Sequence, residues 1–382
     1  MRYKPANARL LWLRLAAACA FVAVTSPVAA FQVLPKVSDV DRKLATLGSN
    51  TYVDAVGQYF VGSALPMIKS PVHEAITLAA LGCASPAGRE RECVTLAAIA
   101  ANRVLLYGVR WPDDPPFPLN RDKPPRISTC DVKVTLRSTA QPKCWYGLFT
   151  DAGRLAEIAY KKNPDVPAFG PGDYLLYRSH YGDLQFMHSM GSVDGELASE
   201  TVARMKMWAK FLWGVSTHQV PTGKFIRDLG MNDLAAYFPG DMTASNLFAT
   251  GIVEVRKDLD KVALGVLLHM VQDSFSQAHV ERAPELGTTC ADLAVDKPGR
   301  IVQFYSYARQ SGPLHDDEDT FNALGLHTVQ VSPNVVDTTK AFIVLWQRLA
   351  AWQEVEGLFD CVFDLQNGNA QAGPGSFVRP QR

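Results

Sequence analysis

The stretch that decides the fold is residues 258–282, DLDKVALGVLLHMVQDSFSQAHVER. Its apolar residues leave no wide polar face, so the pattern predicts a helix that is buried nearly all round rather than one on the surface. Three ionisable side chains nevertheless lie in it: His269, Asp273 and His279. Because an unpaired ionised carboxylate in a protein interior costs several kcal/mol, something must compensate these groups.

The spacing of the three side chains favours metal ions. His269 and Asp273 lie about 40° apart around a helix and about 6 Å along it, so both can point at one ion. His279 lies about 120° and about 9 Å beyond Asp273 if the helix continues, and is expected to serve a second metal. A core histidine beside a capping aspartate is the simpler interpretation of the first pair alone.

Residues 1–30 have the pattern of a secretory signal peptide. A basic start is followed by the apolar run LAAACAFVAV and by small residues that end at Ala30, where cleavage is expected. The apolar run is too short for a lasting membrane anchor, and no other stretch approaches the required length of about 20 residues. We therefore expect a protein that is exported to the periplasm or secreted and has no stable membrane span.

The mature chain has a slightly negative charge and an even number of cysteines. Removing residues 1–30 removes four of the 38 basic residues and none of the 38 acidic ones, which leaves a net charge near −4. The mature chain therefore has no overall excess of positive charge that would favour nucleic-acid binding. In an oxidising compartment, six cysteines predict disulfides. Short separations favour Cys83–Cys93 and Cys130–Cys144, with Cys290–Cys361 by elimination, although six cysteines allow 15 pairings.

The mature chain is predicted to be all-α, with one domain over residues 31–365 and a flexible tail over 366–382. Residues 112–145 are rich in proline and are expected to form a long loop, here called the Pro-rich excursion, that Cys130 and Cys144 hold together. The predicted helical segments are 36–48, 51–63, 73–82, 94–111, 150–163, 193–216, 223–237, 258–282 and 334–362.

Further histidines and aspartates occur in compact local patterns. They are His73 in PVHEAIT, Asp113 and Asp114 in RWPDDP, His180 in RSHYGD, His188 in FMHSM, and His315 with Asp319 in LHDDEDT. Neutral imidazoles with carboxylates are the ligand set that zinc prefers, and this pool would serve two or three ions. Each pattern alone also has a structural interpretation, such as a turn before Pro115 or an acidic first helical turn.

Two of these patterns together resemble a known motif. His269-x3-Asp273-x5-His279 followed by His315-x3-Asp319-Thr320 resembles the trinuclear zinc motif of the zinc-dependent bacterial phospholipases C and the single-strand-specific nucleases of fungi and plants. Upstream, Trp111-Pro112-Asp113 resembles that superfamily's Trp-x-Asp, Ser179-His180-Tyr181 its Ser-His-aromatic segment, and His73 its first histidine. The resemblance implies an all-α fold with a zinc cleft, and it covers residues 73–320.

The resemblance also implies which residues hold zinc. One ion would be held by Asp113, His180, His269 and Asp273. Asp273 would bridge to a second ion that His73 also binds, and the third would be held by His279, His315 and Asp319. His188 is an alternative to His180, and His188 and Asp114 are further candidates for the metal site or the cleft.

One departure from the superfamily concerns the second ion. In the relatives the mature N-terminal tryptophan binds a zinc shortly before the first histidine, whereas here about forty residues separate Phe31 from His73. Either the chain loops back, or a side chain replaces the amine, or this zinc is weaker or absent. The resemblance implies phosphoester hydrolysis by a zinc-activated water that Asp113 orients or deprotonates.

Among the possible substrates we favour phospholipids. The expected protein is a monomeric phospholipase C that acts on phosphatidylcholine or a similar lipid at a membrane or micelle surface, with aromatic residues such as Trp208 lining an acyl-chain groove. The first alternative is a secreted single-strand nuclease or 3′-nucleotidase that uses the same zinc ions and stacks bases on its aromatic residues. An alternative of another class is a zinc-stabilised, non-catalytic binding protein.

Overall fold

The computed structural model describes residues 71–138, 140–284, 287–290 and 295–378, and this part of the chain is mostly helical. The expected signal peptide and the helices expected at 36–48 and 51–63 lie outside the described residues. The α-helices of the described part are α3 (Val72–Ala80), α4 (Leu96–Arg110), α5 (Pro142–Lys162), α6 (Leu175–Tyr181), α7 (Ala198–Ser216), α8 (Asn232–Tyr237), α9 (Ala244–Ala249), α10 (Leu259–Asp273), α11 (Gly312–Glu318), α12 (Phe321–Gln330), α13 (Val335–Gln347) and α14 (Trp352–Val362).

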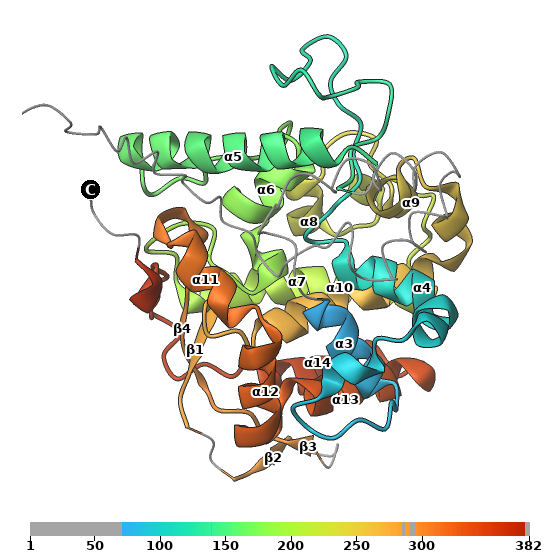
Figure 1. Ribbon diagram of the computed structural model, residues 1–382, viewed down its shortest axis with the longest axis vertical. Coiled ribbons are helices and arrows are strands. Elements are labelled where there is room, and N and C mark those ends of the chain that lie inside the picture. Colours follow the sequence, from blue (N-terminus) through green and yellow to red (C-terminus); the bar gives the residue numbers. More distant parts are fainter. Residues whose placement is uncertain (1–70, 139, 285–286, 291–294, 379–382) are drawn as a thin grey trace, which may run out of the picture.

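Helix α10 lies in the middle of the molecule, with α5 and α6 on one side and α13 and α14 on the other (Figure 1). It packs most extensively against α4 and α7 and also contacts α13 and α3. All residues from Val262 to Asp273 are buried, as the lack of a polar face predicts. Helix α10 is therefore the element around which the other helices are arranged.

Helix α10 ends at Asp273, although the sequence predicts a helical stretch as far as residue 282. The Ser274 hydroxyl donates to the Val271 carbonyl oxygen at 2.7 Å, and the Arg282 Nε atom donates to the Ser274 carbonyl oxygen at 3.0 Å. These side chains compete with the next helical turn for the backbone groups, so the chain turns away. His279 consequently lies in the turn that leads to a short strand, and not on the helix.

Two glycines allow α4 and α10 to cross with their backbones in contact. A Cβ atom on Gly108 would lie 2.3 Å from the Val262 carbonyl oxygen, and one on Gly265 would lie 2.4 Å from the Leu105 carbonyl oxygen. Neither distance is compatible with a side chain larger than hydrogen. The close crossing places the end of α4, and the turn after it that carries Asp113, beside the buried face of α10.

Two small antiparallel sheets accompany the helices, so the fold is not purely α-helical. Strand β1 (Val280–Arg282) pairs with β4 (Ile301–Phe304), and β2 (Thr289–Cys290) pairs with β3 (Val295–Asp296). The first sheet continues to His279, whose carbonyl oxygen accepts a hydrogen bond from the Tyr305 amide at 2.8 Å. This pairing ties the His279 turn to the segment that follows β4.

Two predicted helical segments are interrupted in the structure. The segment at 334–362 is divided into α13 and α14 by Leu349, whose φ of 52° is incompatible with a continuous right-handed helix. The segment at 223–237 contains a short 3-10 turn (Ile226–Asp228) followed by α8. Periodicity predicted the apolar faces, whereas these breaks depend on the local backbone conformation.

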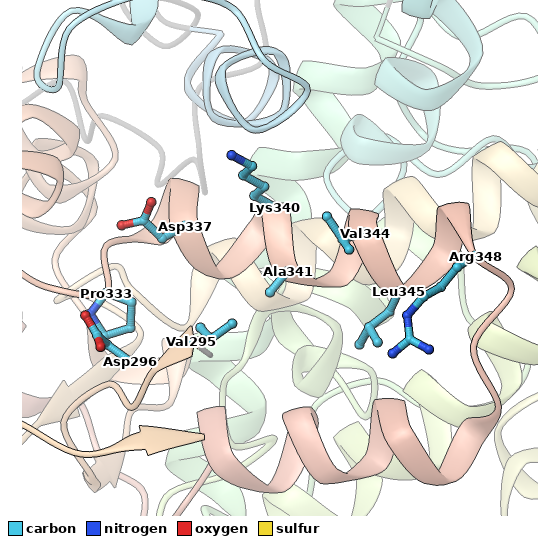
Figure 2. Close-up of a pocket in the computed structure, with 9 residues that line it drawn as sticks. All are labelled: Val295, Asp296, Pro333, Asp337, Lys340, Ala341, Val344, Leu345 and Arg348. Atoms are coloured by element: carbon cyan, nitrogen blue, oxygen red, sulfur yellow. The ribbon is translucent and has the colours of Figure 1, made fainter. Parts of the chain in front are cut away.

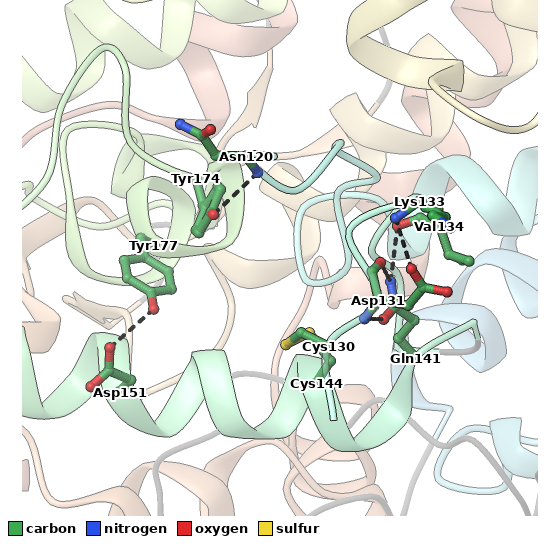
Figure 3. Close-up of a disulfide and its surroundings, with 10 residues drawn as sticks. All are labelled: Asn120, Cys130, Asp131, Lys133, Val134, Gln141, Cys144, Asp151, Tyr174 and Tyr177. Carbon is green, nitrogen blue, oxygen red and sulfur yellow. Dashed lines mark hydrogen bonds between the residues drawn. A yellow bond between two sulfur atoms is a disulfide. The ribbon is translucent and has the colours of Figure 1, made fainter. Parts of the chain in front are cut away.

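Three disulfides join Cys83 to Cys93, Cys130 to Cys144 and Cys290 to Cys361, which are the pairs that the separations favour. Disulfides of this number are typical of proteins from an oxidising compartment. Figure 3 shows how Cys130–Cys144 fastens the Pro-rich excursion to α5, next to the Gln141 side chain, which donates to the Val134 carbonyl oxygen at 2.9 Å. No helix of the described residues combines the length and the apolar character that crossing a membrane requires.

The C-terminal segment is tied to the fold as far as residue 378, although the sequence predicts a flexible tail from residue 366. The Ala372 amide donates to the Glu196 carbonyl oxygen at 2.8 Å, and the Ser311 amide donates to the Phe377 carbonyl oxygen at 2.7 Å. These are backbone hydrogen bonds to distant parts of the chain. They do not require an apolar pattern in the segment itself, which is why its composition did not indicate them.

Candidate metal centre

The nine histidines and aspartates proposed as ligands or as an alternative ligand come together in one buried cluster. Helix α10 supplies His269 and Asp273. The other members come from α3, the turn after α4, α6, the 3-10 turn at Gln185–His188, the turn before β1, and α11 with its C-cap. No side chain in the cluster is more than 4% exposed. The members are His73, Asp113, His180, His188, His269, Asp273, His279, His315 and Asp319.

Asp273 is the centre of the first part of the cluster. Its Oδ2 atom lies 2.9 Å from His188 Nδ1 and 3.0 Å from His269 Nε2, and these two nitrogens are 3.0 Å apart. Its Oδ1 atom lies 3.3 Å from His73 Nε2. A tetrahedral zinc ion with ligand distances of about 2.0–2.1 Å separates its ligand atoms by about 3.3–3.4 Å, so the spacing fits such an ion after a small outward adjustment.

Asp113 and His180 extend this part of the cluster. Asp113 Oδ1 lies 3.9 Å from both His188 Nδ1 and His269 Nε2, and it has no hydrogen-bond partner among the described residues. The rings of His180 and His188 have centroids 5.2 Å apart. Asp113, His180 and His188 offer ligand atoms within 4.8 Å of one another, so the structure brings both alternative histidines to the same aspartate.

His279, His315 and Asp319 form a separate group of potential ligands. The two imidazole Nε2 atoms face each other at 3.1 Å, and Asp319 Oδ2 lies 3.1 Å from His315 Nε2. The second carboxylate oxygen of Asp319 accepts a hydrogen bond from the Ser276 hydroxyl at 3.0 Å. The three ligand atoms lie within 4.8 Å of one another, which makes the group a further candidate metal site.

Hydrogen bonds to the Nδ1 atoms orient these imidazoles. His269 Nδ1 donates to the Val109 carbonyl oxygen at 2.7 Å, and His279 Nδ1 donates to the His188 carbonyl oxygen at 2.7 Å. His315 Nδ1 donates to Gln310 Oε1 at 2.7 Å, because the Gln310 amide nitrogen is already used as a donor to the Ala278 carbonyl oxygen. Second-shell acceptors of this kind fix the tautomer of metal-bound histidines.

The orientation has a direct consequence for His279 and His315. With both protons on Nδ1, the facing Nε2 atoms present lone pairs to each other at 3.1 Å. Two buried lone pairs at this distance repel each other unless a cation lies between them. The donor set therefore fits a metal ion.

His73 has a comparable second shell, whereas His188 has the reverse orientation. His73 Nδ1 lies 2.6 Å from Gln272 Oε1, and the Gln272 amide donates to the Thr77 hydroxyl at 2.9 Å. In His188 it is Nδ1 that faces Asp273, and the buried Nε2 atom has no hydrogen-bond partner among the described residues. Sequence patterns did not indicate Gln272, Gln310 or Ser276, because these residues act by hydrogen-bonding to the candidate ligands His73, His315 and Asp319.

The two aspartates closest to His269 have opposite electrostatic environments. Burial raises the pKa of the Asp113 carboxyl well above its usual range, and the neighbouring charges of Asp273 and Asp319 add to this effect. Burial also opposes the charge of Asp273, but positive charge on His269 or His279, when either is protonated, outweighs it and places the pKa of that carboxyl well below its usual range. Aspartates with pKa values shifted apart in this way are typical of sites where one carboxylate binds and the other handles a proton.

Burial lowers the pKa of five imidazoles in the cluster, which keeps them neutral near pH 7. Neutral imidazole is the form that binds a metal. The five residues are His73, His180, His188, His269 and His279.

Asp114 is the only residue of the proposed site that the described structure places outside these ligand groups. Its carboxylate accepts hydrogen bonds from the Ser138 amide and from the Ser138 hydroxyl, both at 2.7 Å. It fastens the Pro-rich excursion to the end of α4. Adjacent residues of a turn point in different directions. The resemblance assigned the ligand role to Asp113 and left Asp114 as a further candidate for the metal site or the cleft.

A cavity of about 450 Å³ lies elsewhere, along α13, and shares no residue with the candidate metal centre (Figure 2). Its lining residues are Val295, Asp296, Pro333, Asp337, Lys340, Ala341, Val344, Leu345 and Arg348.

Comparisons of the chain with protein-family models, with curated proteins and with solved structures find no match.

Proposed function

We propose that this protein is an exported, zinc-dependent phosphodiesterase of the phospholipase C type. The observation that carries the proposal is that three His and Asp groups overlap, because they share Asp113, His188 and His269, and lie next to the separate group of His279, His315 and Asp319. The residues that form these groups are those whose order along the chain resembles the trinuclear zinc motif. Several ligand groups in one cluster are typical of multi-metal phosphoesterases.

Zinc is the metal that fits this donor set best, because the candidate ligands are neutral imidazoles and carboxylates without thiolates. When bound, neighbouring zinc ions lower the pKa of a water molecule, and a further ion neutralises phosphoryl oxygens. We infer that Asp273 joins the ligands around His73 to those around His269 and His188, since its two oxygens face different imidazoles.

Asp113 is the residue to which we assign the proton transfer. Its buried Oδ1 atom has no hydrogen-bond partner among the described residues, and it lies near two candidate ligands without touching either. The raised pKa of its carboxyl favours uptake of a proton from a water molecule during hydrolysis. In this role Asp113 would orient the attacking water and accept its proton.

Phospholipids remain our preferred substrate class because the mature chain carries no excess of positive charge for a polynucleotide. The aromatic residues Trp208, Phe211 and Trp213 do not support this choice. They are completely buried, and Trp208 packs against Trp111 and Phe248. An acyl-chain groove would have to be formed by other residues.

The near-complete burial of the candidate ligands favours a second candidate function. Structural zinc sites are closed, whereas catalytic sites keep a position open for water and substrate. A zinc-stabilised binding protein is therefore the alternative that the test has to distinguish.

The proposal is tested with the purified mature protein on phosphatidylcholine micelles, with single-stranded DNA as a parallel substrate. We expect release of phosphorylcholine that stops with a chelator, returns with zinc and is lost in Asp273→Asn. The control is Asp114→Asn, which changes the aspartate that bonds to Ser138 outside the cluster. Cleavage of DNA alone would identify a nuclease. Bound zinc without either activity would identify a closed structural site.

A further inference from the structure

Tyr307 carries a buried phenol group beside the candidate metal centre. The proposed chemistry gives this residue no role. It begins a 3-10 turn (Tyr307–Arg309) after β4 and is 3% exposed. Its ring lies edge-on to the His315 ring, with centroids 4.7 Å apart, and edge-on to the Tyr181 ring, with centroids 5.3 Å apart. The side chain is thus enclosed next to a candidate ligand.

The Tyr307 hydroxyl has no hydrogen-bond partner among the described residues, although it is completely buried. Other tyrosines of the fold do have one: the Tyr107 hydroxyl donates to the Phe248 carbonyl oxygen at 2.5 Å, and the Tyr305 hydroxyl donates to Glu281 Oε2 at 3.2 Å. A buried hydroxyl without an acceptor destabilises the folded state, and such groups are rare in proteins. An acceptor that arrives with a ligand would explain why the hydroxyl is kept.

The position of the hydroxyl indicates where that acceptor would lie. The Tyr307 ring contacts His315, which belongs to the group of His279, His315 and Asp319. A phenol hydroxyl has one proton to donate, so an oxygen atom of a ligand bound beside this group would satisfy it.

We propose that the Tyr307 hydroxyl donates a hydrogen bond to an anionic phosphoryl oxygen of a phosphodiester held between Asp113 and the His279–His315–Asp319 group. This inference rests on the proposed function, since it assigns a binding residue to the same site. A phosphodiester is present in both phospholipids and polynucleotides, and the hydrogen bond recognises the group common to both.

The Tyr307→Phe variant removes the hydroxyl and keeps the ring. Because hydrogen bonds to charged groups are among the stronger ones, we expect the affinity for inorganic phosphate to fall about 10- to 100-fold. The zinc content should stay the same, because Tyr307 is not a candidate ligand. The melting temperature of the ligand-free protein should rise, because the variant no longer buries an unpaired hydroxyl.

Tyr107→Phe is the matched control. It also removes a phenol hydroxyl, but from a half-buried tyrosine whose hydroxyl donates a hydrogen bond to the Phe248 carbonyl oxygen. We expect this control to lower the melting temperature and to leave the phosphate affinity within twofold of the wild type. The two variants should therefore change the melting temperature in opposite directions, and only Tyr307→Phe should weaken phosphate binding. A general packing defect at Tyr307 would not produce this pattern.

The measurement is calorimetric titration of zinc-loaded protein with inorganic phosphate, together with kcat and KM on phosphatidylcholine micelles and on single-stranded DNA. Weaker phosphate binding by Tyr307→Phe at unchanged zinc content supports the inference, and the substrate whose kcat/KM falls identifies the source of the phosphodiester. Unchanged phosphate affinity overturns it and leaves the proposed function intact, as would follow if an ordered water satisfies the hydroxyl. Wild-type protein that carries zinc but neither binds phosphate nor cleaves either substrate overturns both.

Discussion

Two adjacent aspartates show how far the environment of one residue decides its role. Asp113 Oδ1 lies 3.9 Å from His188 Nδ1 and His269 Nε2, whereas the Asp114 carboxylate is bound to Ser138. We expect Asp113→Asn to lower phosphodiester hydrolysis by about 10²- to 10⁴-fold, the range for loss of a general base. Hydrolysis assays at saturating zinc, with the bound zinc measured by mass spectrometry, test this expectation.

The same substitution at Asp114 should affect stability and leave hydrolysis nearly unchanged. We expect Asp114→Asn to retain hydrolysis within twofold and to lower the free energy of unfolding by about 1–2 kcal/mol, because it weakens a charge-assisted pair of hydrogen bonds to Ser138. Urea unfolding of both variants provides the comparison. Similar losses of activity at the two positions would contradict the distinct roles that their contacts imply.

The crossing of α4 and α10 connects the packing of two elements to the geometry of the site. A Cβ atom on Gly265 would lie 2.5 Å from the Val109 amide nitrogen, and the Val109 carbonyl oxygen accepts the hydrogen bond that orients His269. We expect Gly265→Ala to separate the helices and to lower the free energy of unfolding by about 1–3 kcal/mol, since overpacking outweighs the better helix propensity of alanine. The zinc affinity should fall with it.

Gly357 in α14 is the matched control for this substitution. It is also a helical glycine, but a Cβ atom there would have no heavy atom within 4 Å. Gly357→Ala should therefore leave zinc binding unchanged and stabilise the fold by up to about 1 kcal/mol through helix propensity. Thermal unfolding and zinc titration of both variants test these expectations. Full zinc affinity in Gly265→Ala would show that the close crossing of α4 and α10 does not determine the geometry of the metal centre.

At the scale of the whole molecule, the buried histidines link stability to pH. Their folded-state pKa values lie below the ordinary value of 6.5, so the unfolded chain binds protons first as the pH falls. The metal-free protein should therefore lose stability from about pH 7 downwards, by about 1.4 kcal/mol per pH unit for each proton that only the unfolded chain binds. The raised pKa values of Asp113, Asp114, Asp183 and Glu318 act in the opposite direction. The lowered pKa of Asp273 acts in the same direction as the five imidazoles.

Urea unfolding of the chelated protein between pH 7.0 and pH 5.5 measures this dependence. Zinc should steepen it, because protons compete with the metal for the same imidazole nitrogens. A free energy of unfolding that stays constant over this interval would contradict the presence of buried neutral histidines in the folded state.

The sequence by itself determined the features that depend on local patterns. The apolar run around His269 and Asp273 predicted a helix without a polar face, and residues 262–273 are buried accordingly. The separations of the cysteines favoured the three disulfides that the structure contains. Compact His and Asp motifs also marked the members of the buried cluster, because ionisable groups among apolar residues are conspicuous without any knowledge of their partners.

Only the tertiary structure decided which atoms meet. His188 reaches Asp273 across 85 positions of sequence, and His73 reaches Gln272 across 199. The end of α10 at Asp273, the hydrogen bonds of Asp114 to Ser138, and the unpaired hydroxyl of Tyr307 likewise depend on contacts between distant segments. Periodicity reports which face of an element is buried, but the partners on that face are set by the packing of the whole chain, which no local pattern contains.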